Sequence, residues 1–316
     1  MKAVRVMAFG APPAVEAVPD PEPRPGETLV RVAAAALGHL DRTVASGGFP
    51  MAPDPPYTPG VEGAGTVVGG GDLPPGTAVW LRGGGLGTAR DGTAAELVAV
   101  PDAAVHPAPP GADPALAACF FSPATSAWCA VHDVGGSAPG ERVAVTGAGG
   151  AVGALAVQLA AEAGASAVLA VVSRPERAEA VPVVAGRVEV VVGGLDPAVH
   201  GADRPVDLLV DTVGGPDLPR RLACVAPGGR AVLVGYTAGA AVTLDLPALM
   251  ARDVRLLPLN MVRRAETAFG VADALLRRLC SGELALPVTA YPLAAVDRAW
   301  SDLGAGRVRG RVVVVP

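Results

Sequence analysis

The sequence predicts an α/β protein with two domains, a small antiparallel β-barrel and a doubly wound parallel sheet. Three observations support this prediction. The chain has 316 residues, enough for two domains with a large buried core. Its first third carries short β-type segments, whereas from Leu116 strand-like and helix-like stretches alternate. Near the C-terminus the pattern becomes β-like again, so the first domain is expected to recover the end of the chain.

The first 115 residues alternate short β-type segments with turns rich in proline and glycine, as is typical of a small antiparallel barrel. We expect this domain to cover residues 1–116 and to be completed by 263–316, where helix-like 266–281 precedes "GRVRGRVVVVP". The β-type segments are "KAVRVMAF", "ETLVRVAAAA", "GAGTVVGG", "TAVWL" and "AAELVAV".

The middle of the chain, residues 117–262, carries six apolar runs with helix-like stretches between several of them. Runs that are apolar throughout suit a parallel sheet that is buried on both faces. The six runs are "RVAVTG", "AVLAVVS", "RVEVVVG", "VDLLVDT", "GRAVLVG" and "VRLLPLN".

Charge and composition favour a small ligand. The net charge is −5 and the basic residues are scattered singly, which argues against nucleic acid and against an anionic membrane surface as partners. The apolar stretch 153–172 is interrupted by Gln158, Glu162 and Gly164, so a buried helix followed by a buried strand explains it better than a membrane span. We therefore expect a small-molecule substrate, neutral or anionic.

The cysteines indicate a reducing compartment. They lie far apart in the sequence without a C-x-x-C pair, and the N-terminus begins with a strand pattern rather than a signal peptide. We therefore expect reduced thiols and a cytoplasmic protein. The four are Cys119, Cys129, Cys224 and Cys280.

The glycines in "VAVTGAGGAVG" predict a dinucleotide site. They fit Gly147-x-x-Gly150-x-x-Gly153, or the same pattern starting at Ala148, between a predicted strand and a predicted helix. Such a turn brings backbone N–H groups and the positive end of the helix against a pyrophosphate. The alternative is a glycine-rich turn that only packs helix on strand. The predicted cofactor-binding residues here are Gly147, Ala148, Gly149, Gly150, Ala151, Val152 and Gly153.

The end of the second predicted strand favours NADPH. An NAD site usually has Asp or Glu about twenty residues beyond the glycines. This chain instead has Ser173 and Arg174, with Arg177 one turn later. A hydroxyl and two guanidinium groups suit a 2′-phosphate. The alternative is that both arginines are ordinary solvated charges.

Further cofactor contacts are expected where later strands end, because ligands of open α/β sheets bind at the carboxyl ends of the strands. Val213 follows the fourth run, Gly235 and Tyr236 end the fifth, and Asn260 ends the sixth, where it is a candidate to meet the nicotinamide carboxamide.

Motifs along nearly the whole chain resemble one family. They are "PGVEGAGTVV" (59–68), "DGTAAELVAVP" (91–101), "SPATSAW" (122–128), "PGERVAVTGAGGAVG" (139–153), "DLLVDTVGG" (207–215), "PGGRAVLVG" (227–235) and "GRVRGRVVVVP" (306–316). The chain is similar to zinc-independent medium-chain dehydrogenases/reductases, in the quinone oxidoreductase and enoyl reductase branch. The resemblance implies a GroES-like catalytic domain beside a Rossmann domain, NADPH in the cleft, a homodimer joined through the last Rossmann strands, and hydride transfer to an activated C=C or a quinone.

The resemblance also implies that no metal is bound. Where the family's zinc enzymes carry a cysteine and a histidine, this chain has Gly38 and Val61. Glu62 and His39 alone cannot supply the three protein ligands of a catalytic zinc.

The stretch "LGHLDRT" departs from the quinone reductases, which tend to offer an Asn and a Tyr there; Gly38 and Thr43 replace them. The candidate catalytic residues are His39, Asp41, Thr43 and Ser126. Asp41 has a structural alternative, a carboxylate that ties loop backbone, and His39 could equally be a structural histidine. Ser126 stands where the family often places Ser or Thr near the cofactor.

Two classes of function remain. The first is an NADPH-dependent reductase of an activated double bond, quinone or carbonyl on a small apolar substrate. The second is an NADPH-binding protein of the same fold whose redox chemistry is lost or redirected, because a fold can persist while its site changes. The glycine motif favours the first class, and the altered "LGHLDRT" stretch favours the second.

Overall fold

The computed structural model describes residues 1–182, 186–201 and 203–316, and the chain divides into two compact units. The barrel unit comprises Met1–Phe121 and Leu276–Pro316, and the sheet unit comprises Ser122–Leu275. The sequence placed the divisions at 116/117 and 262/263. In the structure the divisions fall at 121/122 and 275/276, the second of them within helix α8 (Ala265–Ser281).

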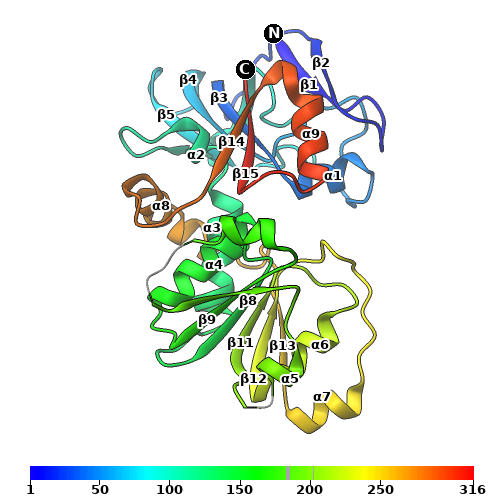
Figure 1. Cartoon of the computed structure of the whole chain (residues 1–316). Coiled ribbons are helices and arrows are strands. Elements are labelled where there is room, and N and C mark those ends of the chain that lie inside the picture. The colour runs from blue at the N-terminus through cyan, green and yellow to red at the C-terminus, as the bar shows by residue number, and fades with distance from the viewer. Residues whose placement is uncertain (183–185, 202) are drawn as a thin grey trace. The chain divides into compact units, whose positions relative to one another are not determined.

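The sheet unit holds six parallel strands in the order β10-β9-β8-β11-β12-β13 (Figure 1). The chain enters at the centre, winds to one edge, returns to the centre and winds to the other edge, as in dinucleotide-binding sheets. This confirms the predicted doubly wound fold. The strands are β8 (Arg142–Thr146), β9 (Ala167–Val172), β10 (Val188–Val192), β11 (Val206–Asp211), β12 (Val225–Leu233) and β13 (Arg255–Pro258).

Helices cover both faces of this sheet, which explains why its central strands β8, β9 and β11 are mostly apolar and buried, whereas the edge strands β10 and β13 are largely exposed. Ala144, Leu169 and Leu209 pack in one core with Leu218 and Leu222 of α6, while α4 packs against β8 and β9. The helices are α3 (Phe121–Trp128), which begins at the unit boundary, α4 (Ala151–Glu162), α5 (Pro197–His200), α6 (Leu218–Leu222) and α7 (Leu246–Arg252), with a 3₁₀-helix at Pro175–Ala180 and a π-helical turn at Cys129–Asp133.

The barrel unit is built on a seven-stranded sheet. Its order is β14-β15-β3-β4-β5-β7, with β6 also paired to β3 and with β1 and β2 forming a separate hairpin (Figure 1). The strands are β1 (Lys2–Arg5), β2 (Ala14–Ala17), β3 (Glu27–Leu37), β4 (Glu62–Gly70), β5 (Ala78–Arg82), β6 (Leu97–Pro101), β7 (Val105–Pro107), β14 (Val288–Pro292) and β15 (Arg311–Val315). Short helices accompany them: α1 (His39–Ala45), α2 (Pro114–Ala117), α9 (Val296–Gly304), and 3₁₀ turns at Asp102–Ala104 and Leu293–Ala295.

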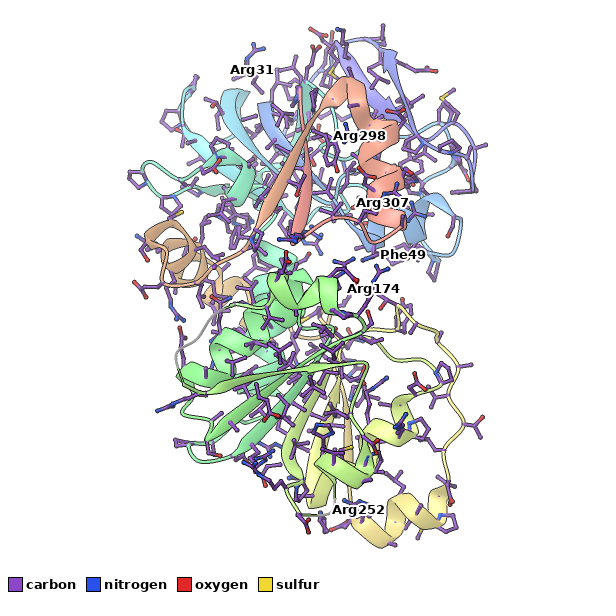
Figure 2. All side chains as sticks on the ribbon, in the orientation of Figure 1. Arg31, Phe49, Arg174, Arg252, Arg298 and Arg307 are labelled. Atoms are coloured by element: carbon purple, nitrogen blue, oxygen red, sulfur yellow. The ribbon has the colours of Figure 1, made fainter. Side chains whose placement is uncertain are left out.

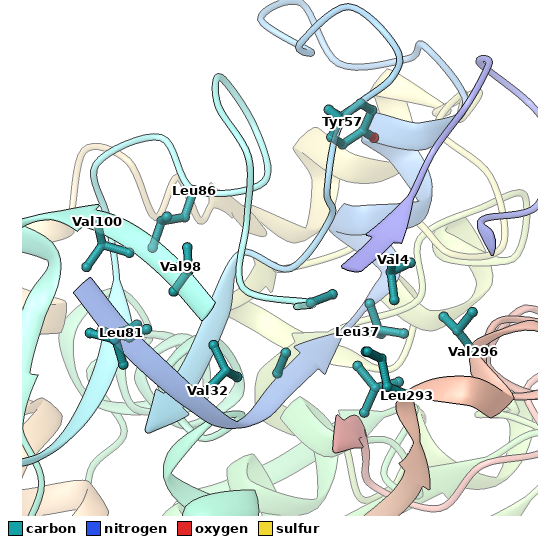
Figure 3. Close-up of a cluster of buried hydrophobic side chains, with 14 of the residues drawn as sticks. Val4, Val32, Leu37, Tyr57, Leu81, Leu86, Val98, Val100, Leu293 and Val296 are labelled. Atoms are coloured by element: carbon teal, nitrogen blue, oxygen red, sulfur yellow. The ribbon is translucent and has the colours of Figure 1, made fainter. Parts of the chain in front are cut away.

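The core of the barrel unit joins both ends of the chain. Val4, Leu37 and Leu81 pack in one cluster with Leu293 and Val296 (Figure 3). Strand β15 lies between β14 and β3, antiparallel to β3, so the C-terminal run completes a sheet begun by the N-terminal residues.

Stretch 153–172 separates into most of α4 and the whole of β9, as the sequence predicted. Within the described ranges, no helix is both long enough and apolar enough to cross a bilayer.

Candidate functional site

The glycine turn joins β8 to α4, and its geometry requires glycine at two positions. Gly147 has a φ of +63°, which L side chains rarely adopt. A Cβ on Gly153 would overlap the carbonyl oxygen of Gly147, so glycine at 153 allows α4 to start close to the strand. Gly150 is different, because it is exposed and its Cβ would meet only that carbonyl, at 3.2 Å.

The N-terminus of α4 is suited to an anion. Gly150 is the N-cap residue, and among the described residues no side chain caps this helix. The first N–H groups of an α-helix have no acceptor within the helix. Backbone donors and the positive helix end therefore meet at an exposed glycine, where a pyrophosphate fits without a Cβ in its way. The residues present fit a dinucleotide.

A second turn, residues 212–215, is fixed beside the first. The Thr212 hydroxyl donates to the carbonyl of Thr146 (2.8 Å), and the Thr212 N–H donates to the Thr146 hydroxyl (3.1 Å). A Cβ on Gly147 would lie 3.2 Å from Cγ2 of Val213. The structure thus brings the predicted cofactor residues Gly147 and Val213 together.

A buried ion pair holds this second turn. Asp211 is fully buried, and its Oδ1 accepts hydrogen bonds from the N–H groups of Val213 (2.9 Å) and Gly214 (2.7 Å). Its Oδ2 accepts from Nε of Arg221 at 2.6 Å, and the same guanidinium donates to the carbonyl of Gly214. Every partner of the carboxylate is a fixed donor, so the turn has little freedom to move.

The ends of β12 and β13 supply the remaining predicted contacts. A Cβ on Gly214 would lie 2.9 Å from both the Gly235 carbonyl oxygen and the Tyr236 Cα, so both residues adjoin the second turn. Tyr236 is 66% exposed and free of core packing. Asn260 is also exposed, but its Oδ1 accepts from the N–H groups of Val262 (3.0 Å) and Arg263 (3.2 Å), which leaves Nδ2 as the group that a ligand could meet.

The residues after β9 border the glycine turn. Ser173 and Arg174 are exposed, and Arg174 extends from the loop that follows the strand (Figure 2). A Cβ on Gly149 would lie 2.9 Å from the carbonyl oxygen of Arg177, so the main chain of the 3₁₀-helix packs directly on the turn. The three residues proposed to read a 2′-phosphate therefore belong to a segment in contact with the glycines.

The candidate catalytic residues lie on both units. Ser126 is half-buried on α3 of the sheet unit, whereas His39, Asp41 and Thr43 belong to α1 of the barrel unit. The Thr43 hydroxyl donates to the carbonyl of His39 at 3.0 Å, a bond within the helix.

Asp41 ties backbone together. Its carboxylate is 1% exposed and accepts from the N–H groups of Gly38 (2.7 Å), Gly60 (2.9 Å) and Val61 (3.2 Å). Burial raises the pKa of this carboxyl, and the N–H donors from Gly38 and Gly60 oppose that rise. This arrangement fits the structural alternative for Asp41.

Arg311, at the start of β15, adjoins Gly38 and Glu62, and sequence reasoning did not single it out. Its Nε donates to the carbonyl of Cys119 (3.2 Å), its Nη2 lies 4.0 Å from Oε1 of buried Glu62, and its Nη1 would lie 2.9 Å from a Cβ on Gly38. Burial lowers the pKa of His39, and the positive charges of Arg311 and Arg42 lower it further. The signal in the sequence was a basic residue in "GRVRGRVVVVP", a motif used for its β character and for the family resemblance.

Across the described part of the chain, no group of three or more His, Cys, Asp and Glu side chains is arranged to hold a metal ion. In particular, Glu62 is engaged with Arg311.

Comparison with known proteins identifies the family. The family "Alcohol dehydrogenase GroES-like domain" matches residues 24–110, and "Zinc-binding dehydrogenase" matches 151–276. The chain is 34% identical to a zinc-type alcohol dehydrogenase-like protein of Schizosaccharomyces pombe, over 73% of this chain and 69% of the relative. It is 29% identical to an acrylyl-CoA reductase of Ruegeria pomeroyi, over 92% and 90%.

Similar solved structures support the same family assignment. A quinone oxidoreductase of Thermus thermophilus, solved also in its complex with NADPH, is 31% identical and matches with a TM-score of 0.82 over the whole of both chains. The fold and these relatives confirm both the predicted resemblance and the GroES-like and Rossmann architecture. The chain belongs to the medium-chain dehydrogenase/reductase superfamily of nicotinamide-dependent oxidoreductases, in the branch of the quinone oxidoreductases and enoyl reductases.

Proposed function

We propose that this oxidoreductase uses NADPH, without zinc, to reduce an activated C=C bond, a quinone or a carbonyl group on a small apolar substrate. The observation that carries the proposal is the open N-terminus of α4 at Gly150, bordered by the segment that contains Ser173, Arg174 and Arg177. When bound, the cofactor supplies a hydride. The groups that bind the acceptor and stabilise its developing charge must come from the chain.

The preference for NADPH over NADH rests on charge. Neither Asp nor Glu follows β9 directly; the first residues are Ser173 and Arg174. A 2′-phosphate can pair with guanidinium groups there, whereas the ribose 2′-OH of NADH lacks the carboxylate acceptor that NAD sites usually provide.

Zinc independence rests on the groups present around α1. A catalytic zinc needs three protein ligands, and Gly38 and Val61 carry no ligand atom in their side chains. Charge that develops on the substrate oxygen must therefore be stabilised by hydrogen-bond donors of the protein.

The relatives support the acceptor class. Quinone oxidoreductases and an acrylyl-CoA reductase share this fold, and their names describe reduction of a conjugated system. In each case hydride addition leaves negative charge on an oxygen conjugated with the reacting carbon.

The test is a pair of titrations followed by turnover assays. Cofactor-free protein is titrated with NADPH and with NADH while nicotinamide fluorescence is followed, and tight binding of NADPH alone is expected. Oxidation of NADPH is then measured with 2-cyclohexen-1-one, 1,4-benzoquinone and a small aldehyde. Binding of neither cofactor would reject the proposal.

The second candidate is an NADPH-binding protein without redox activity. The observation in its favour is the stretch Gly38–Thr43, in which the Asn and Tyr of related reductases are replaced and the Thr43 hydroxyl bonds within its own helix. Tight NADPH binding with no turnover of any acceptor class would favour this candidate.

We also propose a cytoplasmic homodimer. Strand β13 is an edge of the parallel sheet, so its outer backbone groups are available to pair with a second copy. Light scattering at several protein concentrations tests the dimer, and a monomer at all of them would refute it.

A further inference from the structure

Nearly every backbone group of the second turn, residues 212–215, has a hydrogen-bond partner. All four N–H groups donate, that of Thr212 to the Thr146 hydroxyl, those of Val213 and Gly214 to Asp211, and that of Gly215 to the carbonyl of Gly239. The carbonyl oxygens of the last three residues accept from the N–H of Ala238, the guanidinium of Arg221 and the N–H of Leu218. Within the part of the chain that the structure describes, the Thr212 carbonyl is the one group of this turn left without a donor.

Glycine at position 235 keeps the Thr212 carbonyl oxygen open. A Cβ on Gly235 would lie 2.5 Å from this oxygen, closer than a Cβ can come. Thr212 is half-buried, so its carbonyl is not sealed in the core. A Cβ on Gly147 would meet the Thr212 hydroxyl, which puts the residue directly beside the glycine turn. The second turn thus offers one unused acceptor next to the predicted pyrophosphate site.

The order of the strands tells which half of the cofactor this acceptor would meet. Strands β9, β8, β11 and β12 are neighbours in that order (Figure 1). With NADPH bound as proposed, its 2′-phosphate lies with Ser173 and Arg174 after β9, and its pyrophosphate lies at the start of α4 after β8. The nicotinamide half then extends to the other side, toward the end of β11, where the second turn begins. The donors on that half are the ribose hydroxyls and the carboxamide NH₂.

The ion pair beside the second turn supplies geometry rather than stability. The side chains of Arg221 and Asp211 are 9% and 0% exposed, and Nε lies 2.6 Å from Oδ2. The desolvation of two buried charges offsets most of their attraction, so such a pair adds little to the free energy of unfolding. The single guanidinium does, however, hold two parts of the turn at once: the carboxylate that accepts from its N–H groups, and the carbonyl of Gly214.

We propose that Arg221 is a positioning residue for the cofactor. Through Asp211 and the Gly214 carbonyl, it holds the second turn in the form in which the Thr212 carbonyl oxygen accepts a hydrogen bond from the nicotinamide half of NADPH. Because the turn is fixed before the cofactor binds, binding loses little entropy in ordering it. This inference rests on the proposed function and concerns binding alone.

Isothermal titration calorimetry with two ligands tests this inference. NADPH carries both halves of the cofactor, whereas adenosine 2′,5′-bisphosphate carries the adenosine half with its 2′-phosphate and lacks the nicotinamide and its ribose. Arg221→Leu should raise the Kd for NADPH about tenfold and leave the Kd for the bisphosphate within about twofold of the wild-type value, because only NADPH must then order a loosened turn. Each titration is run well below the unfolding midpoint of the variant, so a loss of stability alone does not change Kd.

Arg220→Leu is the matched control. Arg220 precedes Arg221 in α6, but its side chain is 58% exposed and pairs with Asp196 instead of the turn. Both Kd values should match those of the wild type. Arg221→Lys keeps the charge without the two directed N–H groups of a guanidinium, so it should recover part of the affinity and bind NADPH about threefold more weakly than the wild type. This variant decides the question if Arg221→Leu does not fold.

Two results would overturn the inference. If the Arg221 variants lower the unfolding midpoint and bind NADPH like the wild type, the arginine has a structural role only. If they weaken NADPH and the bisphosphate equally, the second turn does not serve the nicotinamide half. In both cases the wild type still binds NADPH, whereas a wild-type protein that binds neither NADPH nor NADH rejects the proposed function itself.

Discussion

The N-termini of α4 and α1 differ in the polar groups that surround them. At α1, the carboxylate of Asp41 lies within the fold and accepts from Gly38, Gly60 and Val61. At α4, among the described residues no side chain caps the helix, and an exposed glycine stands at its start. The backbone before α1 is thus tied to another loop by a carboxylate of the chain, whereas the exposed start of α4 is open to an anion from outside.

The difference separates architecture from binding. A buried carboxylate that accepts from several N–H groups stabilises its loop, and its loss should lower the free energy of unfolding. An uncapped helix N-terminus gains its acceptor only when a ligand binds, and substitutions at that terminus should weaken ligand binding. The predictions below test this distinction, beginning with the largest effect.

Gly153→Ala should be the most damaging change at the open turn. Its Cβ would overlap the carbonyl oxygen of Gly147, which is backbone and cannot rotate away. We expect NADPH to bind at least 100-fold more weakly and the free energy of unfolding to fall by about 2 kcal/mol, as for overpacked sites. Fluorescence titration and urea unfolding measure the two effects.

Gly270→Ala is the matched control. Gly270 lies in α8 and a Cβ there would have no neighbour within 4 Å. The free energy of unfolding of this variant should rise by up to about 1 kcal/mol, because alanine is favoured over glycine in a helix interior. Unchanged NADPH affinity in Gly153→Ala would mean that the turn is only a packing device.

Asp41→Asn should destabilise the protein by about 2 kcal/mol, because an amide NH₂ would face backbone donors in a buried place. NADPH affinity should not change. The exposed Asp113, which accepts from the N–H of Ala115 at 2.9 Å, provides the control. Asp113→Asn should cost only a few tenths of a kcal/mol, because Asn caps helices almost as well as Asp. Equal losses in both variants, measured by urea unfolding, would contradict the comparison.

Replacing Arg174 and Arg177 together by alanine should weaken NADPH binding about tenfold and leave NADH binding unchanged, since two charge-assisted contacts to a phosphate are lost. Fluorescence titration with both cofactors decides this. Equal losses for the two cofactors would show that the arginines do not read the 2′-phosphate.

The smallest expected effect concerns pH. Arg230 donates to both oxygens of Glu141 (2.9 and 2.7 Å) and lowers its pKa, while the N–H of Arg24 and the side chain of Arg90 lower that of Glu27. A carboxyl whose pKa is lowered by folding contributes stability above its unfolded value, near 4.5, and loses it as the pH falls through the folded pKa.

Glu141→Gln should therefore lower the free energy of unfolding at pH 7 by about 1 kcal/mol, a small loss because solvent screens this partly exposed ion pair. The variant should also show a smaller decrease in stability below pH 4.5, because the titrating carboxyl is gone. Glu27→Gln should lower the free energy of unfolding by a smaller amount, because a single guanidinium nitrogen donates to that carboxylate. Urea unfolding from pH 3 to 7 measures both, and a larger effect for Glu27 would be the contrary result.

The sequence allowed the parallel sheet and the glycine turn to be predicted because their determinants are local. Gly147, Gly150 and Gly153 follow one apolar run and open one helix, so a short window contains the signal. Strands β2, β7 and β14 were not predicted. Such strands are short or largely exposed, as in Ala14–Ala17, and acquire their identity from pairing rather than from an apolar pattern.

The candidate catalytic site was less accessible to sequence reasoning. The sequence showed that Gly38 and Thr43 replace the residues of related reductases, but the group beside Gly38 comes from the other end of the chain. Only the antiparallel pairing of β15 with β3 brings Arg311 there. Asp41 could not be assigned for a similar reason, because two of its partners, Gly60 and Val61, belong to a different loop.

The position of β15 also orders events on the ribosome. Every strand of the sheet unit has been synthesised by residue 258, whereas the barrel sheet receives β14 and then β15 only when residues 288–315 emerge. The sheet unit, which holds the glycine turn, can therefore assemble on a growing chain, while the barrel unit, which holds Gly38, must wait for β14 and β15. Arg311, the first residue of β15, is synthesised after every strand of the sheet unit, so a product truncated before residue 311 would keep the glycine turn and lack the arginine.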